Sequence, residues 1–175
     1  MPQPVTQPDL QDVREQLPRH PAKQYHTRER QDIKRIVVHQ TGFPAATPPA
    51  ALARVQIIRH DAPGIPYHFV ISGDGDIFWT QALENVLQSN LHYEINADSV
   101  AVALAGDFSS QAPEPAQLAA AADLIAWLAS ELELGLDRVV GRNELEAVVS
   151  PGAQWRRGAR YKKTLLGLVR ARLNE

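Results

Sequence analysis

The sequence contains no cysteine. This absence excludes disulfide bonds, iron–sulfur clusters, thiol nucleophiles and every zinc site that uses cysteine ligands. The lack of cysteine therefore limits the chemistry that the chain can perform, but it does not indicate whether the protein works in an oxidising or a reducing compartment.

An excess of positive charge and a long apolar run are also lacking. The formal net charge is -2, which argues against the electrostatic field of a nucleic-acid-binding protein. No apolar run approaches the roughly 18 residues of a membrane span. The start Met1-Pro2-Gln3-Pro4 lacks the charged and apolar regions of a secretory signal. We therefore expect a soluble chain with no nucleic-acid partner and no membrane span.

The composition is that of an ordinary globular protein, with 44% hydrophobic and 22% charged residues among 175. A chain of this length typically forms one domain and buries roughly two thirds of its unfolded surface. It needs neither a disulfide nor a metal for stability.

Residues 1–33 are rich in proline and poor in large apolar side chains. We interpret them as an extended N-terminal arm with one short helix near residues 9–16. The basic residues of the arm are interspersed with acidic ones, so they predict a solvated face. These basic residues are Arg14, Arg19, Lys23, Arg28 and Arg30.

The remainder alternates between strand and helix patterns. Predicted strands are Ile36 to Thr41, Tyr67 to Ile71, Asp76 to Thr80, Ser99 to Ala105 and Val139-Val140. Predicted helices are residues 50–60, with Leu52, Val55 and Ile58 on one side, 115–134, ended by Gly135, and 160–173. Residues 81–97 and 141–158 read as irregular. Ser72-Gly73-Asp74-Gly75 is typical of a tight hairpin turn.

This order of elements predicts the α/β class, as a single domain with a central mixed β-sheet flanked by helices and an antiparallel hairpin. Polar side chains at the strand ends and in the irregular loops would then line a groove. His39 is the foremost candidate, because three β-branched residues lead into it at the end of a buried strand.

Five blocks of residues, in this order and spacing, resemble the N-acetylmuramoyl-L-alanine amidase family, which also contains peptidoglycan recognition proteins and phage lysozyme-like amidases. They are Ile36 to Thr41, Pro66 to Ile71 with Gly73 to Ile77, Asn96 to Phe108, Gly141 to Glu144, and Ser150-Pro151-Gly152. The resemblance covers about residues 33–173, and it implies an amidase-like domain over residues 34–175.

The resemblance implies a zinc enzyme that hydrolyses the amide between the lactyl group of N-acetylmuramic acid and L-alanine of the stem peptide. By position, His39 corresponds to the first zinc ligand and Tyr67 to a tyrosine that assists catalysis. The second ligand, a histidine in the family, falls on Arg142. The third, a cysteine or aspartate, falls on Ser150, and some relatives with serine there bind peptidoglycan without cutting it.

These two replacements speak against zinc on chemical grounds. A hydrolytic zinc needs about three protein ligands and an open position for water. A guanidinium has no acceptor and a permanent charge, and a neutral serine is a poor ligand. We expect no metal and no bound cofactor, with His39 the only retained ligand position. A zinc site would be possible only if Asn143, Glu144 or Glu146 took the place of the missing ligands.

The expected binding groove consists of His39, Tyr67, His92, Asn96, Arg142 and Ser150. Either His92 or Leu91 stands where relatives have a histidine that lines the groove. Arg142 has two possible roles: it could donate hydrogen bonds to a carboxylate or amide oxygen of a stem peptide, or it could pair with Glu144 or Glu146. We predict that His68 is a core histidine, because strand side chains alternate and Tyr67 points the other way.

Three functions follow from the resemblance. The leading hypothesis is a non-catalytic domain that binds peptidoglycan or a muropeptide. The first alternative is an active zinc-dependent N-acetylmuramoyl-L-alanine amidase with altered ligands, in which Tyr67 would be catalytic. The second is a protein-interaction module on a degenerate amidase scaffold. Relatives meet their substrate outside the cytoplasm, so the family role implies an extracytoplasmic location and an export signal that this chain does not carry.

Overall fold

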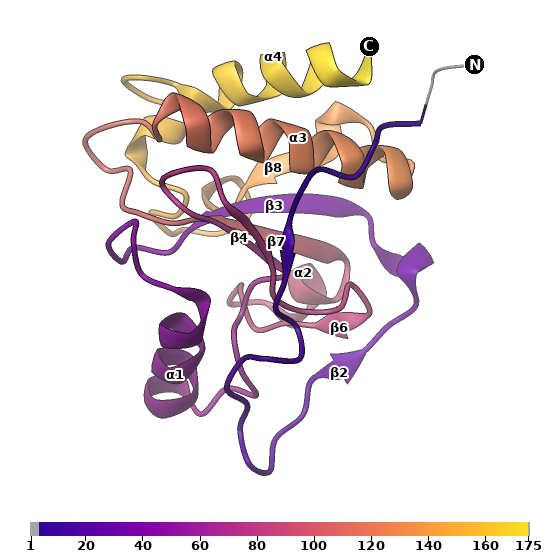
Figure 1. Ribbon diagram of the computed structural model, residues 1–175, viewed down its shortest axis with the longest axis vertical. Helices are drawn as coiled ribbons and strands as arrows, with labels where there is room; N and C mark the ends of the chain where they lie inside the picture. The colour runs from indigo at the N-terminus through magenta and orange to yellow at the C-terminus, as the bar shows by residue number, and fades with distance from the viewer. Residues whose placement is uncertain (1–3, 175) are drawn as a thin grey trace.

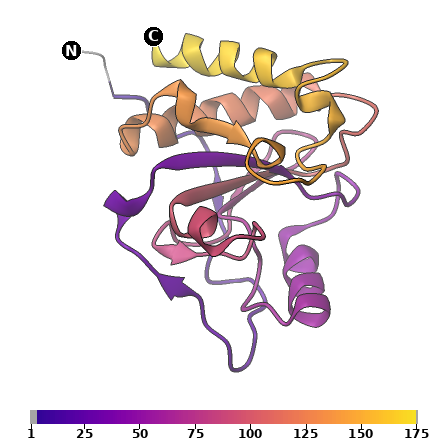
Figure 2. The same cartoon turned by 180° about the vertical axis from the view of Figure 1, so that it is seen from behind.

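The computed structural model describes residues 4–174 of the chain. Residues 1–3 of the predicted arm and Glu175 of the predicted domain lie outside the described residues. Three layers are visible in Figure 1: helices α3 and α4 on one side, a mixed sheet in the middle and helix α1 on the other side. Figure 2 shows the same layers from behind. The predicted α/β fold with a central mixed sheet is therefore confirmed.

The sheet has six strands in the order β1-β5-β4-β7-β3-β8, and β2 pairs with β6 in a separate ribbon. The strands are β1 (Gln11–Asp12), β2 (His26–Thr27), β3 (Arg35–Gln40), β4 (Phe69–Ile71), β5 (Ile77–Trp79), β6 (Asn85–Val86), β7 (Ser99–Leu104) and β8 (Val139–Gly141). The α-helices are α1 (Pro49–His60), α2 (Tyr93–Ala97), α3 (Pro115–Glu131) and α4 (Tyr161–Leu173). None of the helices in the described part of the chain is long and apolar enough to cross a membrane.

Strands β3 and β7 form the centre of the sheet and run parallel in register from Arg35 opposite Ser99 to Gln40 opposite Leu104. Every residue of β7 is buried, as expected for a parallel strand covered on both faces. Alternate side chains of β7 pack against different layers. Val100, Val102 and Leu104 belong to the core under α3 and α4, while Ala103 packs with the residues around α1.

The predicted hairpin is present. Strands β4 and β5 pair antiparallel, and the Ser72 and Asp76 backbones close the turn at 2.9 Å. Gly75 has a φ of +91°, and a Cβ there would lie 2.7 Å from the backbone oxygen of Ala116. Glycine is therefore required twice at this position, by the backbone conformation and by the close approach of α3.

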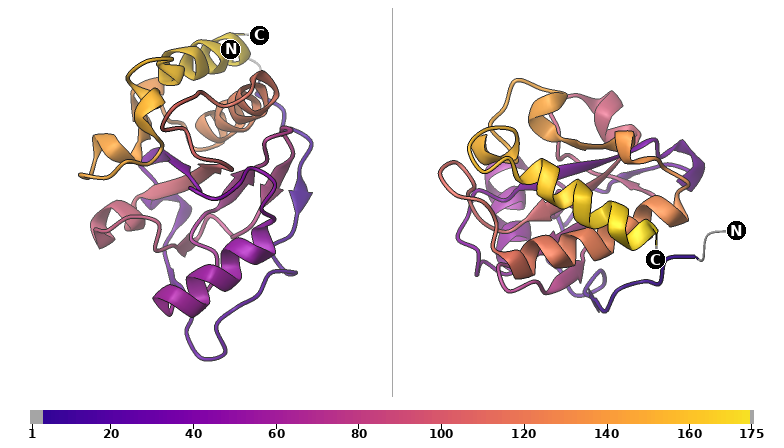
Figure 3. Two further views of the ribbon diagram at one scale, coloured as in Figure 1. Left: turned by 90° about the vertical axis from the view of Figure 1, so that its left-hand side faces the viewer. Right: turned by 90° about the horizontal axis from the view of Figure 1, so that it is seen from above.

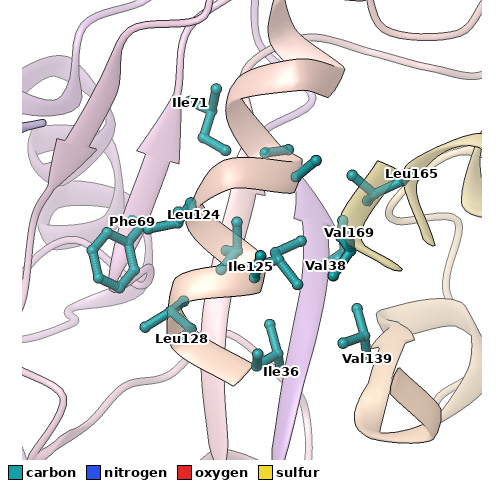
Figure 4. Close-up of a cluster of buried hydrophobic side chains, with 14 of the residues drawn as sticks. Ile36, Val38, Phe69, Ile71, Leu124, Ile125, Leu128, Val139, Leu165 and Val169 are labelled. Carbon is teal, nitrogen blue, oxygen red and sulfur yellow. The ribbon is translucent and has the colours of Figure 1, made fainter. Parts of the chain in front are cut away.

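The larger core lies between the sheet and the α3–α4 layer. In Figure 4, Leu124, Ile125 and Leu128 of α3 lie over side chains of β3 and β4, and Leu165 and Val169 of α4 belong to the same buried cluster. Helix α4 lies across α3, as the view from above shows (Figure 3). The periodic apolar residues predicted for these two helices therefore face the core.

The predicted helix near residues 9–16 is wrong. Gln11–Asp12 instead forms strand β1, parallel to β5 at the edge of the sheet. The guanidinium of Arg14 lies 3.8 Å from the centre of the Trp79 ring and bonds to Asp12 at 2.7 and 2.9 Å. Pairing with an open sheet edge satisfies more backbone groups than an isolated helix turn between Pro8 and Pro18 could.

Three further expectations need correction. Residues 81–97 contain strand β6 and helix α2 rather than irregular chain alone. Helix α3 ends at Glu131, because Glu133, and not Gly135, takes the left-handed conformation that ends it, with a φ of 54°. Ile58 is 80% exposed, since α1 buries its first turns, through Leu52 and Ala53, and not its last.

Substitution of a buried side chain and of an exposed one should lower the free energy of unfolding by different amounts. Leu124 is fully buried, so Leu124→Ala should lower the free energy of unfolding by about 3 kcal/mol through lost transfer energy and a cavity. Ile58→Ala, at an exposed helix position, is the matched control and should change stability by less than about 0.5 kcal/mol. Urea unfolding measures both, and equal losses would contradict the layer assignment.

Candidate functional site

His39 lies near the carboxyl end of β3 with 1% of its surface exposed. Its Nε2 is buried and has no hydrogen-bond partner among the described residues. The ring of Tyr67 lies 5.5 Å away between centroids, at an angle of 54°. The strand end and the segment before β4 therefore bring together the two side chains expected at the centre of the site.

Burial and a neighbouring cation set the charge states of these two rings. Burial, followed by the charge of Arg142, lowers the pKa of His39 to about 3, so the imidazole is neutral at physiological pH. Burial raises the pKa of Tyr67 to about 12, while Arg142 acts in the opposite direction. Arg142 is thus close enough to affect both, although it comes from a segment about 100 residues away in the chain.

Ser150 joins this cluster through the backbone of β3. Its Oγ accepts a hydrogen bond from the Gln40 N–H at 3.0 Å. Gly152, with a φ of +105°, follows closely, and a Cβ there would meet the backbone oxygen of Phe108 at 2.5 Å. The Pro151-Gly152 turn therefore needs glycine to press Ser150 against the strand end.

Arg142 forms an ion pair within the protein. Its Nε donates to Glu146 Oε2 at 2.9 Å, and the side chain of Glu146 is fully buried. Glu146 Oε1 accepts three more bonds, from the backbone N–H groups of Leu91 and His92 at 2.7 and 3.0 Å and from His92 Nδ1 at 3.1 Å. Of the two roles open for Arg142, internal pairing with Glu146 is the one found.

Glu146 is ionised despite its burial. Burial alone would raise its pKa, but the hydrogen bonds from Arg142 and His92 together bring the pKa below the usual range. Because the carboxylate can only accept, His92 must carry its proton on Nδ1. One buried charge therefore ties the loop before α2 to the loop after β8.

Glu144, the other acidic residue of this segment, has different hydrogen-bond partners. Glu144 accepts from the Gly141 N–H at 2.6 Å, from Trp155 Nε1 at 2.9 Å and from Lys162 at 2.6 Å. Trp155 is fully buried, so it is a core residue. Over residues 4–174, no group of three or more His, Asp or Glu residues is arranged to hold a metal ion.

The remaining residues of the expected site differ in how far they are buried. His92 is 65% exposed in its side chain, and Leu91 beside it is 71% exposed. Asn96 is buried, and its Oδ1 accepts from both the backbone N–H and the amide of Asn90 at 2.9 Å. Asn96 therefore holds the loop before α2 in place, while His92 is the residue that this loop presents to solvent.

Arg28 was missed as a structural residue, because the arm was interpreted as a solvated face. Its guanidinium is part-buried and donates to the backbone oxygens of Leu83, Asn96 and Ala97 at 2.9–3.0 Å. Burial lowers its pKa to about 10. The cation therefore lies at the carboxyl end of α2, where it interacts favourably with the helix dipole. No local sequence pattern indicates this role of Arg28.

His68 is a buried, hydrogen-bonded histidine, as predicted. Its Nδ1 accepts from the Ala101 N–H at 2.9 Å, so its Nε2 carries the proton and donates to the Asn85 oxygen at 2.9 Å. Burial, together with the charge of Arg28, lowers its pKa to about 3. The ring is therefore held in one neutral tautomer.

Loss of the Glu146 charge should destabilise the fold. Glu146→Gln leaves the Arg142 guanidinium without its counter-ion and should cost about 3 kcal/mol, at the low end for a broken buried pair because Arg142 is partly exposed. Glu84→Gln is the control, because the Arg30–Glu84 pair lies about half exposed on the surface, and it should cost less than about 0.5 kcal/mol. Similar losses for the two variants, measured by urea unfolding, would contradict the role of Glu146.

The neutral state of His68 predicts a loss of stability in acid. The unfolded chain protonates this side chain near pH 6.5 and the folded protein only near pH 3, so the stabilisation is complete above pH 6.5 and falls below it. From about pH 7.5 to about pH 5, His68 alone should cost about 2 kcal/mol. Urea titrations at several pH values should give a shallower pH slope for His68→Gln. An unchanged slope would exclude His68 as the cause.

Comparisons with known proteins agree with this architecture. The family model of N-acetylmuramoyl-L-alanine amidase matches residues 29–157. No curated protein matches the chain.

Solved structures with the same fold include the Ph2119 endolysin from Thermus scotoductus MAT2119 bacteriophage Ph2119, with a TM-score of 0.73, 18% identity and coverage of 92% of this chain and 99% of that one. Bumblebee PGRP-SA has a TM-score of 0.72 and 22% identity, with coverages of 89% and 94%. Peptidoglycan recognition protein-LE in complex with tracheal cytotoxin, a monomeric diaminopimelic acid-type peptidoglycan, has a TM-score of 0.72 and 18% identity, with coverages of 83% and 88%. The family match spans most of the chain, and the chain therefore belongs to the N-acetylmuramoyl-L-alanine amidase family.

Proposed function

We propose that this protein binds peptidoglycan through a muropeptide and does not hydrolyse it. The observation that carries the proposal is the Arg142–Glu146 ion pair at the position where the resembled enzymes have their second zinc-binding histidine. The fold supports the binding half, because a relative of the same fold, peptidoglycan recognition protein-LE, forms a complex with monomeric peptidoglycan. We also propose an extracytoplasmic location, because the proposed ligand is met there.

The donor set of the site argues against a zinc ion. His39 offers a buried Nε2 without a partner, which suits a metal ligand. Arg142 offers only donors and a positive charge, and Ser150 Oγ already accepts the Gln40 N–H. One nitrogen does not reach the roughly three ligands that a catalytic zinc requires. The residues present therefore do not fit zinc.

The ion pair also accounts for what the site retains. A fixed guanidinium takes over the positive charge that a metal would supply and holds the buried carboxylate of Glu146. Glu146 in turn fixes the backbone of Leu91 and His92. In this proposal the wall around His92 stays ordered without a metal, and Tyr67, His92 and the exposed part of Arg142 present hydrogen-bonding groups to a ligand.

Sedimentation with insoluble peptidoglycan tests the binding. We expect the parent protein to pellet with peptidoglycan and to remain in solution with cellulose. His92→Ala removes an exposed site residue but keeps the backbone bonds to Glu146, and it should weaken binding roughly fivefold, the cost of about one hydrogen bond. His60→Ala, an exposed histidine on α1, should bind like the parent. Parent protein that stays in the supernatant would overturn the proposal and favour a protein-interaction module.

Elemental analysis after dialysis against a small excess of zinc tests the absence of catalysis. We expect zinc at background, and no release of stem peptide from peptidoglycan by the same sample. A content of about one tightly held zinc per chain would instead support the active amidase with altered ligands.

A further inference from the structure

The formal net charge of -2 averages over two regions of opposite sign. Residues 1–155 contain 11 basic and 19 acidic residues, whereas residues 156–174 contain seven basic residues and no acidic one. The second region consists of helix α4 and the loop that leads into it. A charge asymmetry of this size within one domain indicates an anionic partner for the basic region.

Most of these seven cations have no counter-ion within the described part of the protein. Lys162 pairs with Glu144 and Arg172 with Asp123. The other five side chains are exposed, and none of them forms an ion pair with a carboxylate in residues 4–174. We call these five the basic face: Arg156, Arg157, Arg160, Lys163 and Arg170. Their charges are therefore available to a ligand.

Helix α4 directs part of the basic face away from the core. Tyr161, Leu165 and Val169 are buried in the core, so residues 160, 163, 167 and 170, at steps of three and four, fall on the opposite side of the helix. Seen from above, α4 is the outermost element (Figure 3). A Cβ at Gly167 would meet nothing within 4 Å. The result is an open basic stripe about 15 Å long between positions 160 and 170.

The fold holds these like charges close together. The loop before α4 is fixed by backbone hydrogen bonds, from the Arg157 N–H to the Ala153 oxygen at 3.1 Å and from the Arg160 N–H to the Arg157 oxygen at 2.9 Å. Arg160 and Lys163 follow each other by three positions on the helix, a spacing at which like charges repel. Charges within about 10 Å interact at an ionic strength of 0.1 M. An anionic ligand would supply the counter-charges that the basic face lacks.

The surroundings of the basic face distinguish between classes of anionic partner. Tyr161 is the only aromatic residue in positions 156–174 and is 1% exposed, so no ring is available to stack on a nucleic-acid base. The large apolar side chains exposed in residues 4–174 all lie outside this segment, so the face has nothing to insert into a membrane. They are Ile58, Leu91, Tyr93 and Val149. The face fits a partner that offers anionic groups alone.

We propose that the basic face binds a flexible phosphodiester polymer that carries neither bases nor acyl chains. The arginine guanidiniums would hold phosphate oxygens through paired hydrogen bonds, and Lys163 would act as a point charge. The stripe on α4 gives successive phosphates of one chain a row of cations, and Arg156 and Arg157 extend this row into the loop. The proposal uses no residue of the expected binding groove, so it is independent of the proposed function.

Fluorescence anisotropy with a labelled poly(glycerol phosphate) tests the binding. Because each phosphate contact releases a counter-ion, affinity should fall roughly 50-fold between about 50 and 200 mM salt if about four phosphates are contacted. Absence of binding at the lower salt concentration, or an affinity that does not depend on salt, would overturn the proposal.

Two double variants make the test specific. Lys163→Gln with Arg170→Gln should bind the polymer about tenfold or more weakly than the parent and should show a shallower dependence on salt, because two phosphate contacts are lost. Arg54→Gln with Arg59→Gln removes the same charge from exposed positions on α1 and should bind like the parent. Both variants should unfold at the same urea concentration as the parent, since all four side chains are exposed. An equal loss of affinity in both would mean that net charge alone attracts the polymer, and it would refute the basic face as a site.

Two other polyanionic partners serve as competitors in the same assay. A single-stranded oligonucleotide and phosphatidylglycerol vesicles, at equal phosphate concentration, should displace the labelled polymer less effectively than unlabelled poly(glycerol phosphate). Stronger displacement by the oligonucleotide would assign the basic face to a nucleic acid, and stronger displacement by the vesicles would assign it to a membrane surface. Either result would overturn the proposal.

Sedimentation with phosphate-free peptidoglycan separates this proposal from the proposed function. Lys163→Gln with Arg170→Gln should pellet as the parent does. Parent protein that binds the phosphate polymer but not peptidoglycan would support the basic face and refute the proposed function. Parent protein that pellets with phosphate-free peptidoglycan but does not bind the polymer would refute the basic face and leave the proposed function in place.

Discussion

The parallel pairing of β3 with β7 is the constraint on which the rest of the molecule depends. Both strands are buried on both faces, so their backbones can find hydrogen-bond partners only in each other and in the flanking strands β4 and β8. The register places Gln40 opposite Leu104, which brings the loops after β3, β7 and β8 to one edge of the sheet. His39 thereby comes close to residues that follow it by about 100 positions.

At this edge a buried charge joins segments that a cysteine-free chain cannot link by a disulfide. Glu146 collects four hydrogen bonds from Arg142, Leu91 and His92. Such a carboxylate is costly to bury and stable only when fully bonded, so each partner restricts the others. Arg28 performs a comparable task at the other end of α2, where its guanidinium binds backbone oxygens. The two ends of α2 are thus each fixed by one charged side chain.

The family and the site together suggest a division between scaffold and chemistry. The amidase fold is complete, from the hairpin to the Pro-Gly turn beside Ser150. In the function proposed here, this edge would act through hydrogen-bond donors instead of a metal centre. A row of donors favours recognition of carboxylates and carbonyl oxygens, and it offers no way to activate water.

Much of the fold was predictable from local patterns. The β-branched run before His39, the Gly-Asp-Gly turn and the apolar periodicity of residues 115–131 each encode their element by near-neighbour interactions. Ile58 and the segment near residues 9–16 were not predictable in this way, because the extent of α1 covered by the sheet and the open edge beside β5 are properties of the assembled layers. The short elements β6 and α2 depend on strand β2 and on Arg28, which are distant from them in the chain.

The sequence by itself determined which chemical groups are available at the site: a histidine, a tyrosine, an arginine and a serine, with no cysteine. It could name Glu144 and Glu146 as possible partners of Arg142, but both carboxylates were near enough in the chain to serve. Only the tertiary structure decided between them, because Trp155 and Lys162 occupy Glu144 from one side, while the loop of Leu91 and His92 offers its N–H groups to Glu146 from the other. A buried carboxylate goes where its hydrogen bonds can be completed, and that requirement is met in three dimensions.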